Sequence, residues 1–367
     1  MKRTIISFLL VIGCLSLATS MSPAKAADDA WVWLHSLLML PGVSEHEAKV
    51  ADYVEASLPA DIEHRRDDMD NVWFTVGEGK PHLVFVAHTD ELGLVVTGIT
   101  EQGRLKVEGR GGFLPQMYEG RPVVVYTAGG PVNGIVAPRK DYTGRESGQS
   151  LLGFADMFVY LGVESAGDAS GLGVEVGDFI TIRKQITELS PDLICARAVD
   201  DRAGCAVLLA AAHRIRWSRV RGKTVTFAWD VQEETGLVGA GKLAKQLGAD
   251  YVFPVDTFVS TDGPLDEKRF ARIPLGEGLV LRGMDSSTIA PRFELEKVMA
   301  MARKRGIPFQ LGNTGGSTDG TRFIPEGAVS LPMGWPGTYS HSFIEKVHRK
   351  DLQALTDMVV ALVDDFH

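Results

Sequence analysis

The chain has 367 residues, of which 45% are hydrophobic and 23% are charged, so it can bury a substantial core. This length predicts two structural units, or one large α/β domain with an insertion. The formal net charge of −9 argues against a nucleic-acid-binding protein, because such proteins usually carry a clustered basic face.

The first 26 residues have the layout of a secretory signal peptide. Lys2 and Arg3 precede an apolar stretch over residues 5–18, and residues 24–26 (Ala-Lys-Ala) form a small-x-small cleavage site. We therefore expect cleavage after Ala26 and export to the periplasm or the extracellular space.

Two other fates of this segment stay open: a membrane anchor, and lipid attachment at Cys14, which follows Val-Ile-Gly in a lipobox-like order. Beyond the segment no stretch is long and apolar enough to cross a bilayer, so we expect no stable membrane span. Export to an oxidising compartment leaves Cys195 and Cys205, which could pair. A buried free thiol is the simpler interpretation of Cys205, because it lies within an apolar run.

After the signal, the sequence predicts two helices and then two strands. The helices cover residues 31–40 and 44–58, and Ser44 and Glu47 have the spacing of a capping box at the start of the second. The predicted strands are residues 71–76 and 83–87. The second strand is apolar throughout, as expected of a buried parallel strand.

Residues 93–189 have a different sequence pattern. Short β-rich runs, such as residues 121–126 and 179–182, are closely punctuated by glycines, and helical periodicity is weak. Strands at this spacing predict a small all-β barrel or sandwich. We interpret this segment as a β-barrel domain inserted into an α/β unit.

After the insertion, predicted strands and helices alternate again. Predicted helices cover residues 203–215, 240–247, 293–305 and 352–366, and predicted strands cover residues 224–231, 251–255 and 329–333. Strands that alternate with helices predict a mostly parallel sheet flanked by helices. The main domain is therefore predicted as α/β and consists of residues 27–92 and 190–367.

Acidic and histidine residues gather where predicted strands end or a helix begins. In a parallel sheet the carboxyl ends of the strands share one edge, where such folds bind ligands. We therefore expect these side chains to meet in one site, although each alone also has a structural explanation, such as a turn or a helix cap. They are His88, Asp90, Asp200, Asp201, Glu233, Glu234, Asp256 and His341.

These residue types suit metal ions. Two imidazoles and three carboxylates can bind a pair of borderline cations such as zinc, cobalt or manganese. Two such ions roughly 3.5–4 Å apart share a water and lower its pKa. One of the adjacent Glu233 and Glu234 can then bind metal while the other accepts the proton of that water. Asp90, two residues beyond His88, is placed to orient the imidazole.

Five segments carry a family resemblance. They are residues 87–93 (AHTDELG), 198–205 (AVDDRAGC), 232–237 (QEETGL), 255–256 (VD) and 339–345 (YSHSFIE). In this order they resemble the glutamyl and tetrahedral aminopeptidases, the co-catalytic two-zinc group once labelled cellulase M-like. Residues 315–320 (GGSTDG) also resemble a glycine-rich loop of that family, although a plain turn is an equally good interpretation.

The resemblance implies an aminopeptidase that removes N-terminal residues from short peptides with two divalent ions per subunit. Zinc is the expected metal, with cobalt or manganese as alternatives. The resemblance also implies a homo-oligomer, with dimers building up to a dodecamer through the inserted domain, which serves in dimerisation or as a lid. The implied roles are His88 and Asp256 on the first metal, Glu234 and His341 on the second, Asp200 bridging, Glu233 as general base and Asp90 supporting His88.

Three competing hypotheses remain at this point. The first is a related two-metal amidase, deacetylase or carboxypeptidase, against which the all-β texture of the insertion argues. The second is an inactive metal-binding descendant, against which the presence of both Glu233 and Asp200 argues. The third is a cellulase, which would require a pair of carboxylates flanking a sugar.

Overall fold

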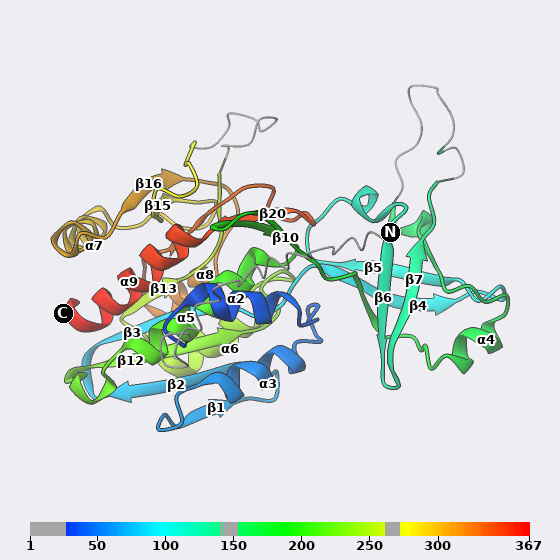
Figure 1. Cartoon of the computed structure of the whole chain (residues 1–367). Coiled ribbons are helices and arrows are strands. Elements are labelled where there is room, and N and C mark those ends of the chain that lie inside the picture. Colours follow the sequence, from blue (N-terminus) through cyan, green and yellow to red (C-terminus); the bar gives the residue numbers. More distant parts are fainter. Residues whose placement is uncertain (1–26, 140–141, 143–152, 261–271) are drawn as a thin grey trace, which may run out of the picture.

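Figure 1 shows the chain as a computed structural model with two units, an α/β unit and a β-barrel beside it. The structure describes residues 27–139, 142, 153–260 and 272–367. The predicted signal peptide, with the alternative lipid site at Cys14, lies outside these described residues. Within them, no helix combines the length and apolar character that crossing a membrane requires.

A six-stranded sheet forms the centre of the α/β unit, in the order β1-β2-β12-β3-β13-β17. Strands β12, β3, β13 and β17 run parallel, whereas β2 pairs antiparallel with β12 and β1 pairs antiparallel with β2. The bounds are β1 (His64–Arg66), β2 (Val72–Gly77), β3 (Gly79–His88), β12 (Gly222–Asp230), β13 (Tyr251–Pro254) and β17 (Val329–Ser330). The prediction of a mostly parallel sheet is confirmed.

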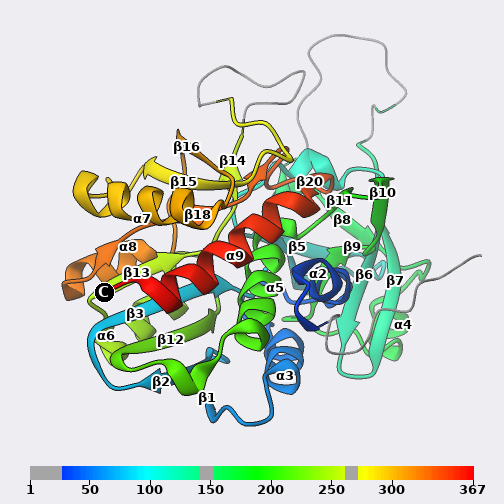
Figure 2. The same ribbon diagram turned by 60° about the vertical axis from the view of Figure 1, so that its left-hand side comes forward.

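The central strand β3 is buried on both faces, as its apolar run predicts. Leu83 and Phe85 belong to a core shared with α2, α5 and α9, whereas Val84 and Val86 pack with residues of α6 and α8. Figure 2 shows α2, α5 and α9 together on one face of the sheet. The helix bounds are α2 (Ala30–Leu38), α5 (Val199–Arg214), α6 (Val238–Leu247), α8 (Gly320–Phe323) and α9 (Arg349–Asp365).

Smaller sheets complete the α/β unit, and the sequence did not predict them. They are formed by β15 (Leu279–Met284), β16 (Phe309–Asn313) and β18 (Met333–Gly334), by β10 (Ile186–Ser190), β11 (Leu193–Ala196) and β20 (Glu345–His348), and by β14 (Phe258–Val259) with β19 (Pro336–Gly337). The predicted strand over residues 329–333 is interrupted. Its first two residues form β17, whereas Met333 begins β18 of another sheet and also bridges in parallel to Val255, and Pro332 between them has no N–H to donate.

The predicted capping box of Ser44 and Glu47 is also wrong. Helix α3 (Ala48–Ser57) begins after these residues, and Glu47 makes no side-chain cap. Instead, the Ser44 hydroxyl donates to Asp90 at 2.6 Å, and the Glu47 carboxylate accepts from the Gln232 N–H at 3.0 Å. Both side chains are therefore bound close to the site and not at the helix end.

The inserted segment forms a closed barrel in the strand order β4-β5-β8-β7-β6-β9, with antiparallel neighbours throughout. Alternate residues such as Leu94, Val96, Val123 and Val125 fill its interior. The strands are β4 (Gly93–Ile99), β5 (Leu105–Arg110), β6 (Pro122–Thr127), β7 (Gly130–Val136), β8 (Phe158–Tyr160) and β9 (Phe179–Ile182). This confirms the predicted all-β barrel; the other helices are α4 (Ala166–Gly171) in this segment and α7 (Arg292–Arg305) in the α/β unit.

A buried ion cluster lies where the chain passes between the two units. The Glu91 carboxylate is 2.6 Å from Lys184, 3.0 Å from Arg197 and 3.7 Å from Arg202. Burial opposes its charge, but the three cations prevail and lower the pKa of Glu91 to about 2. Because Lys184 follows the last barrel strand and Glu91 precedes the first, the cluster ties the barrel to the α/β unit close to His88.

Candidate metal centre

The ends of three parallel strands position the first group of predicted site residues. His88 is the last residue of β3 and pairs in register with Asp230, the last residue of β12. Strand β13 ends at Pro254, two residues before Asp256. Strand β12 stops at Asp230, one residue before the end predicted from the sequence, so a short turn carries the chain from Asp230 to Glu233.

Asp200 and Asp201 lie at the beginning of α5, where their backbone dihedral angles are not helical. The Asp200 carboxylate is 3.3 Å from Nε2 of His88 and accepts from the Ser340 hydroxyl at 3.0 Å. Asp201 is fully buried, and its two oxygens accept from the backbone N–H groups of His88 and Gly204, each at 3.0 Å. Asp200 therefore faces the site, whereas Asp201 fixes the end of β3.

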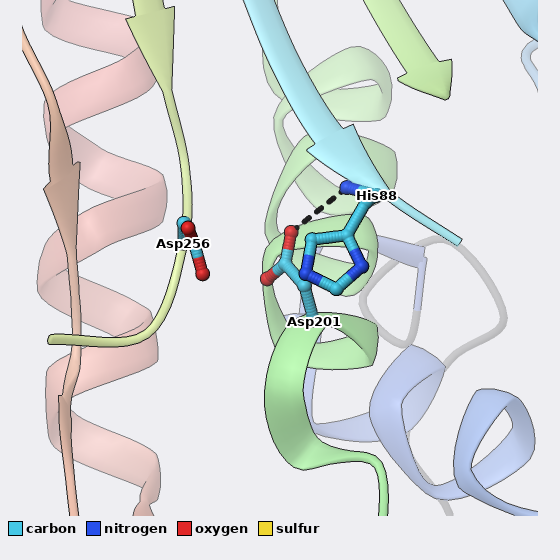
Figure 3. Close-up of side chains that lie close together, drawn as sticks. All are labelled: His88, Asp201 and Asp256. Carbon is cyan, nitrogen blue, oxygen red and sulfur yellow. Dashed lines mark hydrogen bonds between the residues drawn. The ribbon is translucent and has the colours of Figure 1, made fainter. Parts of the chain in front are cut away.

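Two overlapping triads have the spacing of a metal site. One ligand atom from each of His88, Asp200 and Glu234 lies within 4.8 Å of the others, and the same is true of His88, Asp201 and Asp256. Figure 3 shows His88 and Asp201 joined by a hydrogen bond, with Asp256 facing them from the end of β13. Because both oxygens of Asp201 already accept backbone N–H groups, Asp256 and His88 are the available donors of the second triad.

His341 joins this cluster from the far end of the chain. Its Nε2 lies 3.5 Å from Glu234 and 4.0 Å from Asp200. Its Nδ1 donates to the carbonyl oxygen of Gly112, a residue of the inserted segment, at 2.6 Å. A carbonyl can only accept, so this bond fixes the tautomer and leaves the Nε2 lone pair directed at the carboxylates.

Asp90 lies behind the cluster and is fully buried. Its Oδ1 is 3.3 Å from Nδ1 of His88, which leaves Nε2 of that ring facing Asp200. The same carboxylate accepts the backbone N–H groups of Glu233 at 3.0 Å and Glu234 at 3.2 Å. One aspartate therefore orients the imidazole and also holds the turn that carries both glutamates.

The structure adds Glu345, to which the sequence assigned no role. It is buried, and its carboxylate accepts the backbone N–H groups of Asp200 and His341. Its position at the end of the segment YSHSFIE was the only signal in the sequence. Arg282, 3.7 Å from Asp256, and Ser340 are further neighbours without a predicted role.

The charges of the cluster are poorly balanced. Burial, followed by the repulsion of Asp200, raises the pKa of Asp256 to about 6 and that of Glu234 well above its usual value. Burial also raises the pKa of Glu233 well above its usual value. The pKa of Asp200 is instead lowered to about 2, and that of Asp90 is lowered as well, because their interactions with His88 outweigh burial. Crowded, buried carboxylates beside two oriented imidazoles fit divalent cations, which supply the missing positive charge.

All the residues predicted for the site thus meet, and most of them line one cavity of about 650 Å³. Its other lining residues include Gly315, Gly316 and Ser317 of the glycine-rich segment and the two arginines Arg282 and Arg322. The two remaining cysteines are free thiols: Cys195 lies on β11, and the buried Cys205 donates its S–H to the carbonyl oxygen of His88 at 3.1 Å.

A parallel sheet that gathers histidines and carboxylates at the carboxyl ends of its strands, with an inserted β-barrel, defines a metallopeptidase. Residues 70–358 match the family described as M42 glutamyl aminopeptidase, and the chain belongs to that family. It is therefore a metal-dependent aminopeptidase, and the family predicted from the sequence is confirmed.

Known relatives match over most of their length. The chain is 26% identical to the glutamyl aminopeptidase of Lactococcus lactis, over 84% of this chain and 88% of that one. It is 24% identical to the lysyl aminopeptidase of Pyrococcus furiosus, over 91% and 97%. Among solved structures it is similar to the TET1 peptidase of Pyrococcus horikoshii, described as able to assemble into a tetrahedron or a large octahedral shell. The TM-score is 0.84 and the identity 32%, over 91% of this chain and 99% of that one.

Proposed function

We propose that the chain cleaves N-terminal residues from short peptides with two divalent metal ions per subunit, zinc in the first place and cobalt or manganese as alternatives. Asp200 bridges the two ions and Glu233 is the general base. His88 and Asp256 hold one ion, and Glu234 and His341 hold the other. The observation that carries this proposal is the position of Asp200, 3.3 Å from Nε2 of His88 and 4.0 Å from Nε2 of His341.

The donor set supports two ions rather than one. The two imidazoles approach Asp200 through different carboxylate oxygens, Oδ1 for His88 and Oδ2 for His341. A carboxylate that offers one oxygen to each side is suited to bridge a pair of cations. When bound, the pair supplies a water of lowered pKa and positive charge opposite the scissile carbonyl oxygen.

Glu233 is left for proton transfer. Its neighbour Glu234 faces His341, and Asp90 holds the backbone N–H of both glutamates in place. Burial raises the pKa of Glu233, so its carboxylate binds a proton more readily than an exposed one does. Glu233 accepts the proton of the attacking water and passes it to the amine of the leaving peptide.

The test uses the purified protein, a panel of aminoacyl anilides and one peptide in free-amine and N-acetylated forms. We expect hydrolysis of the free-amine peptide, loss of activity with a strong chelator, recovery with zinc, cobalt or manganese, and two metal ions per subunit by elemental analysis. Cleavage of the acetylated peptide alone, or activity that survives complete metal removal, would contradict the proposal.

We also propose that the chain forms a homo-oligomer through the barrel, building from dimers to a dodecamer. The assembly described for the Pyrococcus horikoshii TET1 peptidase supports this, because the two folds match over 91% of this chain. Size-exclusion chromatography with light scattering gives the mass directly. The mass of a monomer at every protein concentration tested would contradict this part of the proposal.

Export through the first 26 residues is a further part of the proposal. The basic start, the apolar run and the Ala-Lys-Ala site support it. Mass spectrometry of the protein from a fractionated host should find a mature chain that begins at Ala27 outside the cytoplasm. A lipid on Cys14 would support the anchored alternative, and an intact first segment in the cytoplasm would contradict export.

A further inference from the structure

Two arginines are the charged residues in the described lining of the cavity that the proposed metal centre does not use. They are Arg282 and Arg322. Every other charged or titratable side chain of that lining is a proposed metal ligand or the proposed base. The two arginines are therefore the candidates for recognising a charged group of the substrate.

The positive charge of Arg282 is already matched. The side chain is 3% exposed and lies 3.7 Å from Asp256 and 3.5 Å from Asp285. It also donates to the carbonyl oxygen of Thr257. With two carboxylates beside it, Arg282 stabilises the wall behind Asp256 and has little charge left for a substrate.

Arg322 differs from Arg282 both in its exposure and in its charge partners. It is exposed, and within the described part of the chain no carboxylate lies at ion-pair distance from it. One guanidinium nitrogen donates to the carbonyl oxygen of Gly236 at 2.6 Å, and a Cβ at Gly241 would lie 3.8 Å from its Cδ. The side chain therefore rests on the start of α6, and its head is held two residues from Glu234 with donors to spare.

A second hollow continues from this point, away from the metal centre. It shares Gly236, Leu237 and Arg322 with the first cavity and has a volume of about 750 Å³. Two lysines and one glutamate also line it: Lys242, Lys245 and Glu326. Lys242 contacts Asp67 and Asp68, whereas Lys245 is exposed. Past Arg322 the described lining therefore carries Lys245 as an exposed cation and Glu326 as its one acidic residue.

We propose that Arg322 binds a carboxylate of the peptide on the leaving side of the scissile bond. This inference rests on the proposed function and narrows its substrate class to short peptides with a negative charge downstream of the cleaved residue. The carboxylate is either the free C-terminus of a short peptide or an acidic side chain close behind the bond. Arginine suits both, because its planar fork matches a carboxylate.

The experiment compares three peptides with the same N-terminal residue: Ala-Ala-Ala, its C-terminal amide and the amide of Ala-Glu-Ala. For each enzyme, kcat/KM is measured on all three, and the ratios to the uncharged amide are the readout. We expect the wild-type enzyme to prefer at least one charged peptide by about three- to tenfold at low salt, and the preference to shrink at high salt. A preference for Ala-Ala-Ala would show that the bound carboxylate is the free C-terminus, and a preference for the amide of Ala-Glu-Ala would show that it is the acidic side chain.

Three variants identify the residue responsible. Arg322→Gln should bring both ratios close to one, Arg322→Lys should keep part of the preference, and Arg292→Gln, at a side chain 92% exposed on α7, should leave the ratios as in the wild type. Because each ratio is internal to one enzyme, a general loss of activity does not affect it.

Three results would overturn this inference. The first is a wild-type preference that Arg322→Gln leaves unchanged, and the second is a wild-type enzyme without any preference. The third is an Arg322→Gln variant that instead loses discrimination between glutamyl and glutaminyl anilides, which would place Arg322 at the N-terminal side chain. A wild-type enzyme that cleaves none of the peptides would overturn the proposed function, and this inference with it.

Discussion

Glu345 holds the backbone of His341, whose N–H donates to Oε1 of the glutamate at 2.9 Å. The other oxygen of Glu345 accepts from the backbone N–H of Asp200 at 3.1 Å, 145 residues away in the sequence. His341 has a positive φ of 62°, which a non-glycine residue rarely adopts without support. One buried carboxylate therefore joins the segments that carry the proposed bridging ligand and the last histidine.

Glu345→Gln should weaken metal binding. A glutamine has only one acceptor oxygen, so its amide group would face one of the two backbone donors and loosen either His341 or Asp200. We expect metal affinity to fall by about 10- to 100-fold, as for other groups that orient ligands. Titration against a competing chelator measures this. Glu101→Gln, an exposed change on the barrel, is the matched control, and equal affinities in the two variants would contradict the prediction.

Glu233→Gln should retain both metal ions and lose turnover. The substitution removes the proton acceptor but keeps the size of the side chain and the backbone bond to Asp90. We expect kcat to fall by about 10²- to 10⁴-fold, the range of general acid–base catalysis. Aminoacyl-anilide hydrolysis and elemental analysis of the same sample give both quantities. Activity near that of the wild type would show that another group is the base.

Asp200→Asn should weaken occupancy of both metal sites together. An amide offers one neutral oxygen in place of two charged ones, so neither ion keeps its full ligand set. Occupancy is measured by elemental analysis after dialysis against a weak chelator. Asp168→Asn, on the exposed α4, should leave both ions in place. Clean loss of a single ion from the Asp200 variant is the result that a bridging role cannot explain.

Glu91→Gln should destabilise the fold strongly. The change leaves the buried guanidinium groups of Arg197 and Arg202 without their counter-charge, beside Lys184, whose pKa burial lowers to about 7, and we expect a cost of about 3–5 kcal/mol in the free energy of unfolding. Urea denaturation at pH 8 measures this. Glu108→Gln, at a side chain 66% exposed, is the control and should stay close to the wild type.

The effect of Glu91 should depend on pH in a defined direction. The pKa of this carboxyl is about 2 in the folded chain, compared with an ordinary value of 4.5. Its charge therefore contributes its full stabilisation at every pH at which the carboxyl is ionised in the unfolded chain as well. The difference between wild type and Glu91→Gln should be full above about pH 4.5 and shrink as the pH falls towards 2. An equal difference at pH 8 and pH 3 would show that packing, and not charge, is responsible.

Local sequence patterns determined much of this fold. The apolar run at residues 83–87 predicted a buried parallel strand, because a strand covered on both faces has no polar side, and β3 confirms it. The glycine-punctuated β-rich segment likewise predicted the barrel. The capping-box pattern of Ser44 and Glu47 misled because the same side chains found buried partners, Asp90 and the Gln232 N–H, which no local pattern reveals.

The sequence by itself predicted that His88, Asp200, Glu234, Asp256 and His341 come together, because all of them follow strand ends or precede a helix that a parallel sheet brings to one edge. Only the tertiary structure decided how they are oriented. The carbonyl of Gly112 selects the tautomer of His341, and Glu345 ties that histidine to Asp200. These bonds join residues far apart in the chain, so they exist only after packing has brought the barrel, the sheet edge and the C-terminal segment together.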